Sequence, residues 1–205
     1  MGRRGILIDQ DGTLCEPFSE QHGETRGLRL LPRAAEALVR ANAAGLQTVL
    51  ITNQPAIARG LLSGDRLAEL HDALREQLAG VGARLDGIYY CPHGPASPDD
   101  PRSGCDCRKP RPGMLRRARD QMGIDLAESY VIGDRLTDVE TGVAVGATSL
   151  LVLTGEGRAE QMRRAGEPPV PAFVAVDLLD AVEWILERER HPSPMLPAAQ
   201  TGRNP

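Results

Sequence analysis

The sequence lacks an excess of positive charge. It has 24 Lys and Arg residues against 28 Asp and Glu, which gives a formal net charge of −4 and a pI of about 5.6. Proteins that bind nucleic acid usually carry a basic surface, so we expect no nucleic-acid partner. A small anionic substrate would have to be held by a few well-placed cations.

Long apolar segments and cysteines are also scarce. No apolar run approaches the about 18 residues of a membrane-spanning helix, and the start "MGRRGILID" lacks the apolar middle of a signal peptide. The four cysteines are too few for a disulfide framework and are more typical of metal ligands or buried thiols in a reducing compartment. We therefore expect a cytoplasmic protein with no membrane partner.

What the sequence does have is an alternation of short apolar runs and amphipathic stretches. Strands are predicted at 4–9, 46–53, 85–91, 129–134, 147–155 and, weakly, 172–176; helices are predicted at 32–45, 63–80, 112–123, 136–146 and 177–190. Strands that are apolar throughout and alternate with helices are typical of a parallel sheet covered on both faces. We predict one α/β domain over residues 1–190, with a Rossmann-like, doubly wound sheet.

Two segments stand outside this alternation. Residues 91–112 are too rich in Pro and Gly for a helix or a central strand, yet they contain Cys and His residues that a passive linker does not need. The tail at 191–205 has neither periodicity nor apolar mass, and we expect it to be disordered.

Polar residues end three of the predicted strands. Asp9 and Asp11 follow the first, Thr52 and Asn53 end the second, and Asp134 follows "YVIG". Ligands of parallel sheets bind beyond the carboxyl ends of the strands. If these strands are neighbours, the three aspartates form an oxygen-rich site that suits Mg²⁺, and Mg²⁺ would offset the cost of burying adjacent carboxylates.

Each motif also has an ordinary structural explanation. Asp-Gly after a strand is often only a turn, and Asp134 could simply cap the next helix. Their occurrence together, in order and at strand ends, favours a catalytic site. Residues two apart in a strand project to the same face, so Asp9 and Asp11 can meet one phosphoryl group if Gly12 allows the chain to bend.

With Lys109 included, the set "DQDGT", "TN", "RKP" and "GD" resembles the phosphatases of the haloacid dehalogenase superfamily over about residues 5–155. The resemblance implies that Asp9 is the nucleophile and that Asp11 is the general acid and then the general base. It implies that Thr52 and Lys109 bind the phosphoryl group. Asp9, the backbone carbonyl of Asp11, and Asp134 would hold Mg²⁺, and a part for Asp138 in this metal site stays open.

A second metal is predicted in the 91–112 segment. Cys91, His93, Cys105 and Cys107 supply three thiols and an imidazole, a complete tetrahedral set for a structural Zn²⁺. Buried apolar cysteines would fit poorly in a loop with so few apolar residues. A DNA-binding zinc ribbon would carry basic residues throughout, whereas "SPDDPRSGCDC" has three aspartates and one arginine.

Four segments narrow the resemblance: "YYCPHGP", "CDCRKPRPGML", "TNQPAIARG" and "YVIGDRLTD". They resemble a capless, zinc-containing branch that comprises phosphatases of D-glycero-D-manno-heptose 1,7-bisphosphate, acting at the 7-phosphate for nucleotide-heptose biosynthesis, and of histidinol phosphate. The resemblance implies substrate contacts from the 15–30 loop, Asn53, Gln54, the pair Arg108 and Lys109, and Arg135. Zinc would then act indirectly, by fixing that pair. We expect a monomer.

The sequence also departs from this branch. Gln10 stands where Arg is usual, Arg135 stands where the heptose enzymes have Lys, and the "CEP" at residues 15–17 is closer to the histidinol phosphatases. A second phosphate needs cations away from the catalytic centre, and arginines would repel the amine of histidinol phosphate, so we expect a sugar bisphosphate. The alternatives are that the substrate is histidinol phosphate or a different small sugar phosphate, or that the protein is a non-catalytic binding protein.

Overall fold

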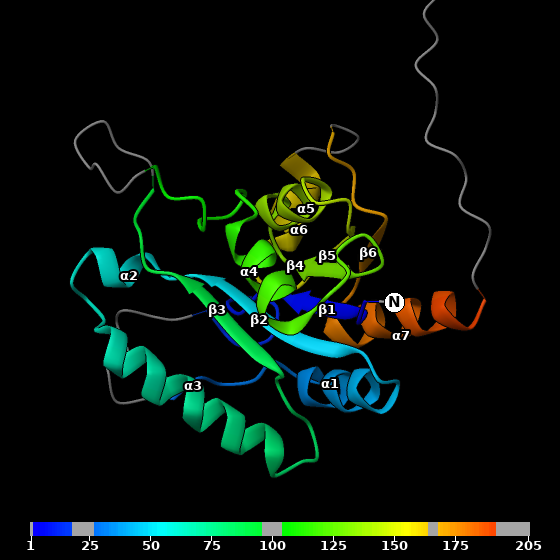
Figure 1. Ribbon diagram of the computed structural model, residues 1–205, viewed down its shortest axis with the longest axis horizontal. Helices are drawn as coiled ribbons and strands as arrows, with labels where there is room; N and C mark the ends of the chain where they lie inside the picture. The colour runs from blue at the N-terminus through cyan, green and yellow to red at the C-terminus, as the bar shows by residue number, and fades with distance from the viewer. Residues whose placement is uncertain (1, 18–26, 96–103, 164–167, 192–205) are drawn as a thin grey trace, which may run out of the picture.

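The computed structural model describes residues 2–17, 27–95, 104–163 and 168–191. Strands and helices alternate through these ranges (Figure 1). The strands are β1 (Gly5–Ile8), β2 (Gln47–Asn53), β3 (Gly87–Cys91), β4 (Tyr130–Gly133), β5 (Thr148–Val152) and β6 (Phe173–Ala175). The helices are α1 (Ala34–Ala43), α2 (Pro55–Ala58), α3 (Gly64–Ala79), α4 (Gly113–Met122), α5 (Leu136–Val143), α6 (Gly157–Arg163) and α7 (Leu178–Arg190).

The strands form one parallel sheet in the order β3-β2-β1-β4-β5-β6. β1 is central: Leu7 pairs with Val49 of β2 on one side and with Val131 of β4 on the other. The chain winds outward from β1 first in one direction and then in the other, which confirms the predicted doubly wound α/β fold. The connections within the described ranges carry no separate cap domain, also as predicted.

One face of the sheet is covered by α1, α3 and α7, as Figure 1 shows. Ile6 and Ile8 of β1 point to this face, where they join one fully buried cluster with Leu38 of α1, Leu74 of α3 and Val182 of α7. Because successive strand residues point to opposite faces, the apolar run of β1 supplies both layers of the core.

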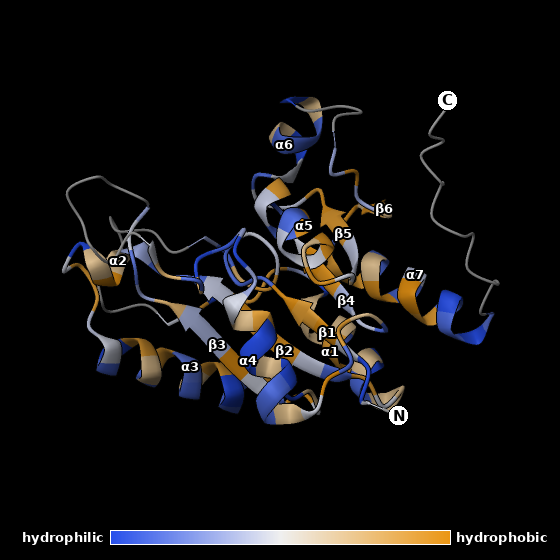
Figure 2. Ribbon diagram, turned by 45° about the horizontal axis from the view of Figure 1, so that its top comes forward, coloured by the Kyte–Doolittle hydropathy of each residue, from blue (hydrophilic) through white to orange (hydrophobic). Residues whose placement is uncertain are grey.

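The opposite face is covered by α4 and α5. Leu7, which lies between Ile6 and Ile8, packs there with Met114 and Leu115 of α4, and Val139 of α5 packs on Leu151 of β5. Figure 2 shows the result: β1 and β5 are coloured as apolar, whereas polar and apolar residues alternate along α3 and α4. A sheet buried on both faces explains why its strands are apolar throughout.

The ends of the elements follow local sequence signals. Ser63 caps α3 by accepting a hydrogen bond from Arg66 N at 3.0 Å, as expected for a serine directly before a helix. α1 begins two residues later than predicted because Arg33, with φ of 63°, precedes it. The short helices α2 and α6 were not predicted, since neither has enough residues to show a periodic apolar pattern.

Some expectations concern residues outside the described ranges. The predicted disordered tail lies there except for His191, as do residues 18–26 of the 15–30 substrate loop and residues 96–103 of the cysteine loop. None of the helices in the described ranges combines the length and the apolar character that crossing a bilayer requires.

Candidate active site

The predicted strand ends meet at one cavity. Because β1 lies between β2 and β4, the residues that follow these parallel strands share one edge of the sheet. They line a cavity of about 420 Å³, whose walls include Asp9, Asp11, Thr52, Lys109 and Asp134. The structure thus brings together the residues expected to be catalytic, although Lys109 comes from the distant cysteine loop.

A tight turn follows Asp9 and Asp11 at the end of β1. Gly12 has a φ of +87°, and the carbonyl of Gln10 accepts a hydrogen bond from Cys15 N at 2.8 Å. Thr154 Oγ1 donates to Gly12 O at 2.6 Å and ties the turn to the loop after β5. The bend predicted at Gly12 is therefore present, and it turns Asp9 and Asp11 toward one site.

Three carboxylates and one ammonium group are buried together at the centre of this site. Asp9, Asp134 and Asp138 can each place an oxygen within 4.8 Å of the others, and all three are buried. The buried Lys109 forms ion pairs with Asp9 and, at 2.7 Å, with Asp138, and its Nζ also donates to Ile51 O at 3.0 Å. With every group ionised, the cluster has a net charge of −2, and burial of an unbalanced charge is costly.

The pKa values reflect this crowding. Burial raises the pKa of Asp9; Lys109 opposes the rise, and Asp138 and Asp134 add to it. Burial likewise raises the pKa of Asp134 to about 6, with a smaller contribution from Asp138. Burial alone would lower the pKa of Lys109, but Asp138 and Asp9 outweigh it and raise that pKa, so the lysine is charged. A further cation beside Asp9 and Asp134 would oppose these rises and favour their ionised forms.

The residues present fit a magnesium ion. Asp134 Oδ2 accepts a hydrogen bond from Glu156 N at 2.8 Å, whereas its Oδ1 is buried without a hydrogen-bond partner. A buried oxygen of this kind is costly unless a cation binds it. Hard carboxylate oxygens are the ligands that Mg²⁺ prefers. Asp138, left open by the sequence, lies in the same carboxylate cluster, and its Oδ2 also accepts from Arg135 N at the start of α5.

Two amides hold the carboxylate of Asp11. Gln10 Nε2 donates to Asp11 Oδ1 and Gln54 Nε2 donates to Asp11 Oδ2, both at 3.3 Å. Gln54 Nε2 also lies 3.0 Å from Thr52 Oγ1. Gln54 was expected to bind substrate; its side chain is buried and turned toward Asp11 and Thr52, two of the residues expected to be catalytic.

The other expected substrate contacts surround the cavity. The side chain of Asn53 forms two hydrogen bonds with the backbone of Lys109: its Oδ1 accepts from the Lys109 N–H at 3.1 Å, and its Nδ2 donates to the Lys109 carbonyl at 3.3 Å. Arg108 and Arg135 line the cavity, and so does Arg59. Arg59 belongs to the segment "TNQPAIARG" and stands directly after α2, and that helix brings it to the cavity wall.

The predicted zinc ligands gather beside this cavity. Cys91, His93, Cys105 and Cys107 can place one ligand atom each within 4.8 Å of the others. Cys91 Sγ lies 3.7 Å from Cys105 Sγ and 3.2 Å from Cys107 Sγ, and His93 Nδ1 lies 3.3 Å from Cys107 Sγ. Zn–S bonds of about 2.3 Å in a tetrahedron place sulfurs about 3.8 Å apart, whereas a disulfide requires about 2 Å. The four residues fit a structural zinc ion.

Hydrogen bonds connect this cysteine cluster to arginines on either side of Lys109. Arg108 Nη1 donates to His93 O at 3.0 Å, and Arg111 Nη1 donates to Cys105 O at 2.7 Å. Gly113 N, at the start of α4, donates to Asp106 O at 2.9 Å. The loop that carries Lys109 is thus held between the cysteine cluster and the first turn of α4.

Comparison with known proteins agrees with this geometry. A sequence model of the HAD-hydrolase-like family matches residues 106–181. The D-glycero-beta-D-manno-heptose-1,7-bisphosphate 7-phosphatase of Escherichia coli (strain K12) is 40% identical over 153 residues, which are 74% of this chain and 80% of the relative. The enzyme of the same name from Pseudomonas aeruginosa is 38% identical over 182 residues, or 89% and 97% of the two chains.

A solved structure is similar over most of the chain. The crystal structure of D,D-heptose 1,7-bisphosphate phosphatase from B. bronchiseptica, complexed with magnesium and phosphate, superposes with a TM-score of 0.77 and 34% identity, covering 90% of this chain and 99% of that one. The doubly wound fold and the aspartate-lysine site define the class, a HAD-like hydrolase. Within that class, the chain belongs to the family of the D-glycero-beta-D-manno-heptose-1,7-bisphosphate 7-phosphatases.

Proposed function

We propose that this protein removes the 7-phosphate from D-glycero-D-manno-heptose 1,7-bisphosphate through an aspartyl-phosphate on Asp9. The observation that carries the proposal is the buried cluster of Asp9, Asp134, Asp138 and Lys109 at the strand ends, in a chain whose relatives are named for this reaction. The expected monomer and cytoplasmic location stay predictions.

Asp9 is the nucleophile. Lys109 holds Asp9 Oδ1, so Oδ2 is the oxygen that attacks phosphorus. A new bond forms between phosphorus and Asp9 Oδ2 while the bond from phosphorus to the sugar oxygen breaks. The leaving oxygen takes a proton from Asp11, which is within reach because both side chains line the same cavity.

Asp11 then acts as the general base in the second step. As a carboxylate, it accepts a proton from a water molecule, whose oxygen attacks the phosphorus of the aspartyl-phosphate. The bond from phosphorus to Asp9 breaks, inorganic phosphate leaves, and Asp11 is protonated again for the next cycle. The Thr52 hydroxyl lines the cavity and supplies a hydrogen bond to the phosphoryl oxygens, while the Lys109 ammonium supplies positive charge.

Asp9, Asp134 and the backbone carbonyl of Asp11 would hold the magnesium ion, and Asp138 lies close enough to join them. When bound, Mg²⁺ supplies the positive charge that offsets the repulsion between the carboxylates and the phosphate dianion.

Arginines support a substrate with two phosphates. Arg59, Arg108 and Arg135 line the cavity together with the catalytic residues. Guanidinium groups bind phosphate through two hydrogen bonds at once, so they suit the second phosphate of a bisphosphate. The cationic amine of histidinol phosphate would be repelled by them. The relatives are named for the β anomer, and we propose that anomer as the substrate here.

The test is a comparison of kcat/KM for the two heptose bisphosphate anomers, fructose 1,6-bisphosphate and histidinol phosphate, each with Mg²⁺. We expect the β anomer to be preferred. A preference for histidinol phosphate of about tenfold, or roughly 1.4 kcal/mol of transition-state discrimination, would assign the chain to the alternative reaction.

A further inference from the structure

A buried histidine lies behind the proposed general acid. His71 of α3 is 3% exposed, and its Nε2 is 2.9 Å from Oε1 of Gln10, which is itself 1% exposed. The other end of the Gln10 amide faces Asp11, with Nε2 at 3.3 Å from Oδ1. His71, Gln10 and Asp11 therefore form a chain of hydrogen bonds that runs from the interior to the cavity.

The direction of each hydrogen bond in this chain follows from the carboxylate at its end. Once Asp11 has given its proton to the leaving oxygen, its carboxylate can only accept, so the NH₂ group of Gln10 must face it. The amide oxygen of Gln10 then faces His71, and because that oxygen can only accept, the imidazole proton must be on Nε2. A reversed amide would place its oxygen against the carboxylate, which is unfavourable whichever ring nitrogen of His71 carries the proton.

His71 performs this role as a neutral group. Burial lowers its pKa to about 4, and Arg75 on the same helix adds to the effect, whereas Asp72 opposes it. At neutral pH the ring has one N–H, and that proton is committed to Gln10. His71 also lies beside Tyr90, with the ring centroids 6.3 Å apart. The imidazole is therefore restrained by Tyr90 as well as by its hydrogen bond with Gln10.

We propose that His71 and Gln10 are positioning residues that hold the carboxyl group of Asp11 in place for proton transfer to the leaving oxygen. The proposal rests on the proposed phosphatase function. Gln54 holds Asp11 Oδ2, so Gln10 completes a pair of donors, one on each oxygen. His71 prevents the Gln10 amide from rotating. Without that restraint Asp11, which is only partly buried, would sample orientations that miss the substrate.

If His71 only stabilised the hydrophobic core, its substitution would have different consequences. Its loss would lower stability and reduce activity on every substrate by the same factor. A residue that positions the general acid matters only when the leaving group needs a proton. Alkoxide leaving groups of sugar phosphates need one, whereas p-nitrophenolate is stable enough to leave without one.

The experiment therefore compares kcat/KM for two substrates, because this ratio reports the first chemical step, in which Asp11 is the acid. The substrates are heptose bisphosphate and p-nitrophenyl phosphate, and the variants are His71→Leu, Gln10→Met and His71→Gln. For His71→Leu and Gln10→Met we expect kcat/KM on the sugar phosphate to fall about 10- to 100-fold, and that on p-nitrophenyl phosphate to change less than about threefold. His71→Gln keeps a donor at a similar reach and should restore the sugar phosphate rate.

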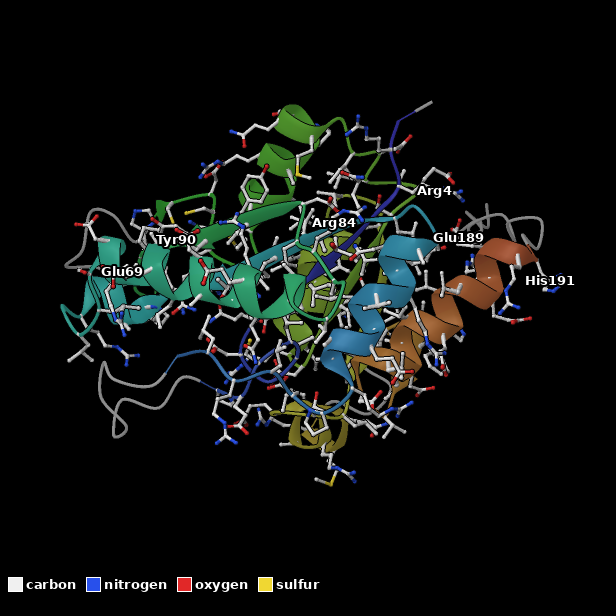
Figure 3. The ribbon with its side chains drawn as sticks, turned by 90° about the horizontal axis from the view of Figure 1, so that it is seen from below. Arg4, Glu69, Arg84, Tyr90, Glu189 and His191 are labelled. Carbon is white, nitrogen blue, oxygen red and sulfur yellow. The ribbon has the colours of Figure 1, made fainter. Side chains whose placement is uncertain are left out.

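A double variant tests whether the residues act as one unit. Because His71 is expected to work only through Gln10, His71→Leu combined with Gln10→Met should cost no more than Gln10→Met alone. The matched control is His191→Leu, which replaces an exposed histidine at the far end of α7; Figure 3 labels it well away from Tyr90, the neighbour of His71. This control should leave both rates unchanged.

Equal losses on both substrates, no loss on either, or fully additive losses would each overturn the proposal. If His71→Leu does not fold, Gln10→Met and His71→Gln still decide it. A failure of the proposed function is distinguishable: if the wild-type enzyme does not hydrolyse heptose bisphosphate, the same contrast is measured with glycerol 3-phosphate, an alkyl phosphate with the same need for a proton on the leaving group.

Discussion

The backbone of Gly12 passes directly against the carboxylate of Asp134. A Cβ added to Gly12 would overlap Asp134 Oδ2 and lie 2.9 Å from the Cα of Gly155. Gly12 follows the aspartate pair after β1, and Asp134 follows β4, so the contact joins the loop of the proposed nucleophile to a carboxylate of the proposed magnesium site. The absence of a side chain at residue 12 is what allows these two strand ends to approach each other.

Gly12→Ala should therefore displace Asp134 and weaken Mg²⁺ binding, with kcat/KM falling by at least about 100-fold because a small displacement of a catalytic group is costly. Titration calorimetry with Mg²⁺ and phosphate-release assays measure the two effects. Gly82→Ala is the control, since Gly82 also has a positive φ, +77°, but nothing lies near its Cβ position. It should lower stability by about 1–2 kcal/mol and leave Mg²⁺ binding unchanged. Equal effects of both substitutions would contradict the steric explanation.

Asp9→Asn should abolish turnover while the protein still folds. The amide is a very poor nucleophile, and uncatalysed phosphate ester hydrolysis is extremely slow, so phosphate release should drop by at least about 1,000-fold. Asp120→Asn, an exposed aspartate of α4 paired with Arg119, should behave as wild type. Near-normal activity of purified Asp9→Asn would exclude the aspartyl-phosphate mechanism.

Cys107→Ser should release zinc and lower activity without touching the chemistry directly. Arg108 and Lys109 follow this residue at once, and Arg108 is bonded to the carbonyl of His93, so loss of the metal should misplace both cations. Elemental analysis and kcat/KM are the measurements. Cys15→Ala removes the buried cysteine outside the cluster and should keep a full complement of zinc. Full activity in a zinc-free preparation would refute the indirect role.

His71 should make stability depend on pH. Its pKa is lowered by burial from 6.5 to about 4, so between these values the unfolded state binds more protons than the folded state. The contribution of His71 is therefore present above about pH 6.5 and is lost as pH falls toward 4. From pH 7 to pH 4, wild type should lose up to about 3 kcal/mol more unfolding free energy than His71→Gln, measured by urea denaturation. A parallel decline of the two proteins would show that His71 is not buried in its neutral form.

Much of the fold could be predicted because its causes are local. Strands apolar throughout, such as Gly5–Ile8, can only be buried on both faces, and that pattern predicts a parallel sheet covered by helices. Ser63 caps α3 through a bond to Arg66, three residues away. The short helices α2 and α6 escaped prediction because helices of this length owe their stability to tertiary packing rather than to a periodic pattern of their own.

Many residues of the candidate site could likewise be predicted from the sequence. Asp9, Asp11, Thr52 and Asp134 could be found from the sequence because they stand at the ends of predicted strands, and Lys109 could be found through the family resemblance. The cysteine and histidine ligands could also be found, since Zn²⁺ accepts few kinds of donor. These choices are written in residue identity and short spacing, and neither needs the position of distant parts of the chain.

Only the tertiary structure decided which neighbours these residues meet. The order of the strands places Asp138 beside Lys109, turns Gln54 toward Asp11 rather than outward, and brings His71 of α3 against Gln10 of the β1 turn. Such contacts join segments far apart in sequence, and they depend on the packing of whole helices on the sheet. By itself the sequence determined which chemical groups the site contains; the fold determined their hydrogen-bond partners and their pKa values, because both are set by three-dimensional proximity and burial.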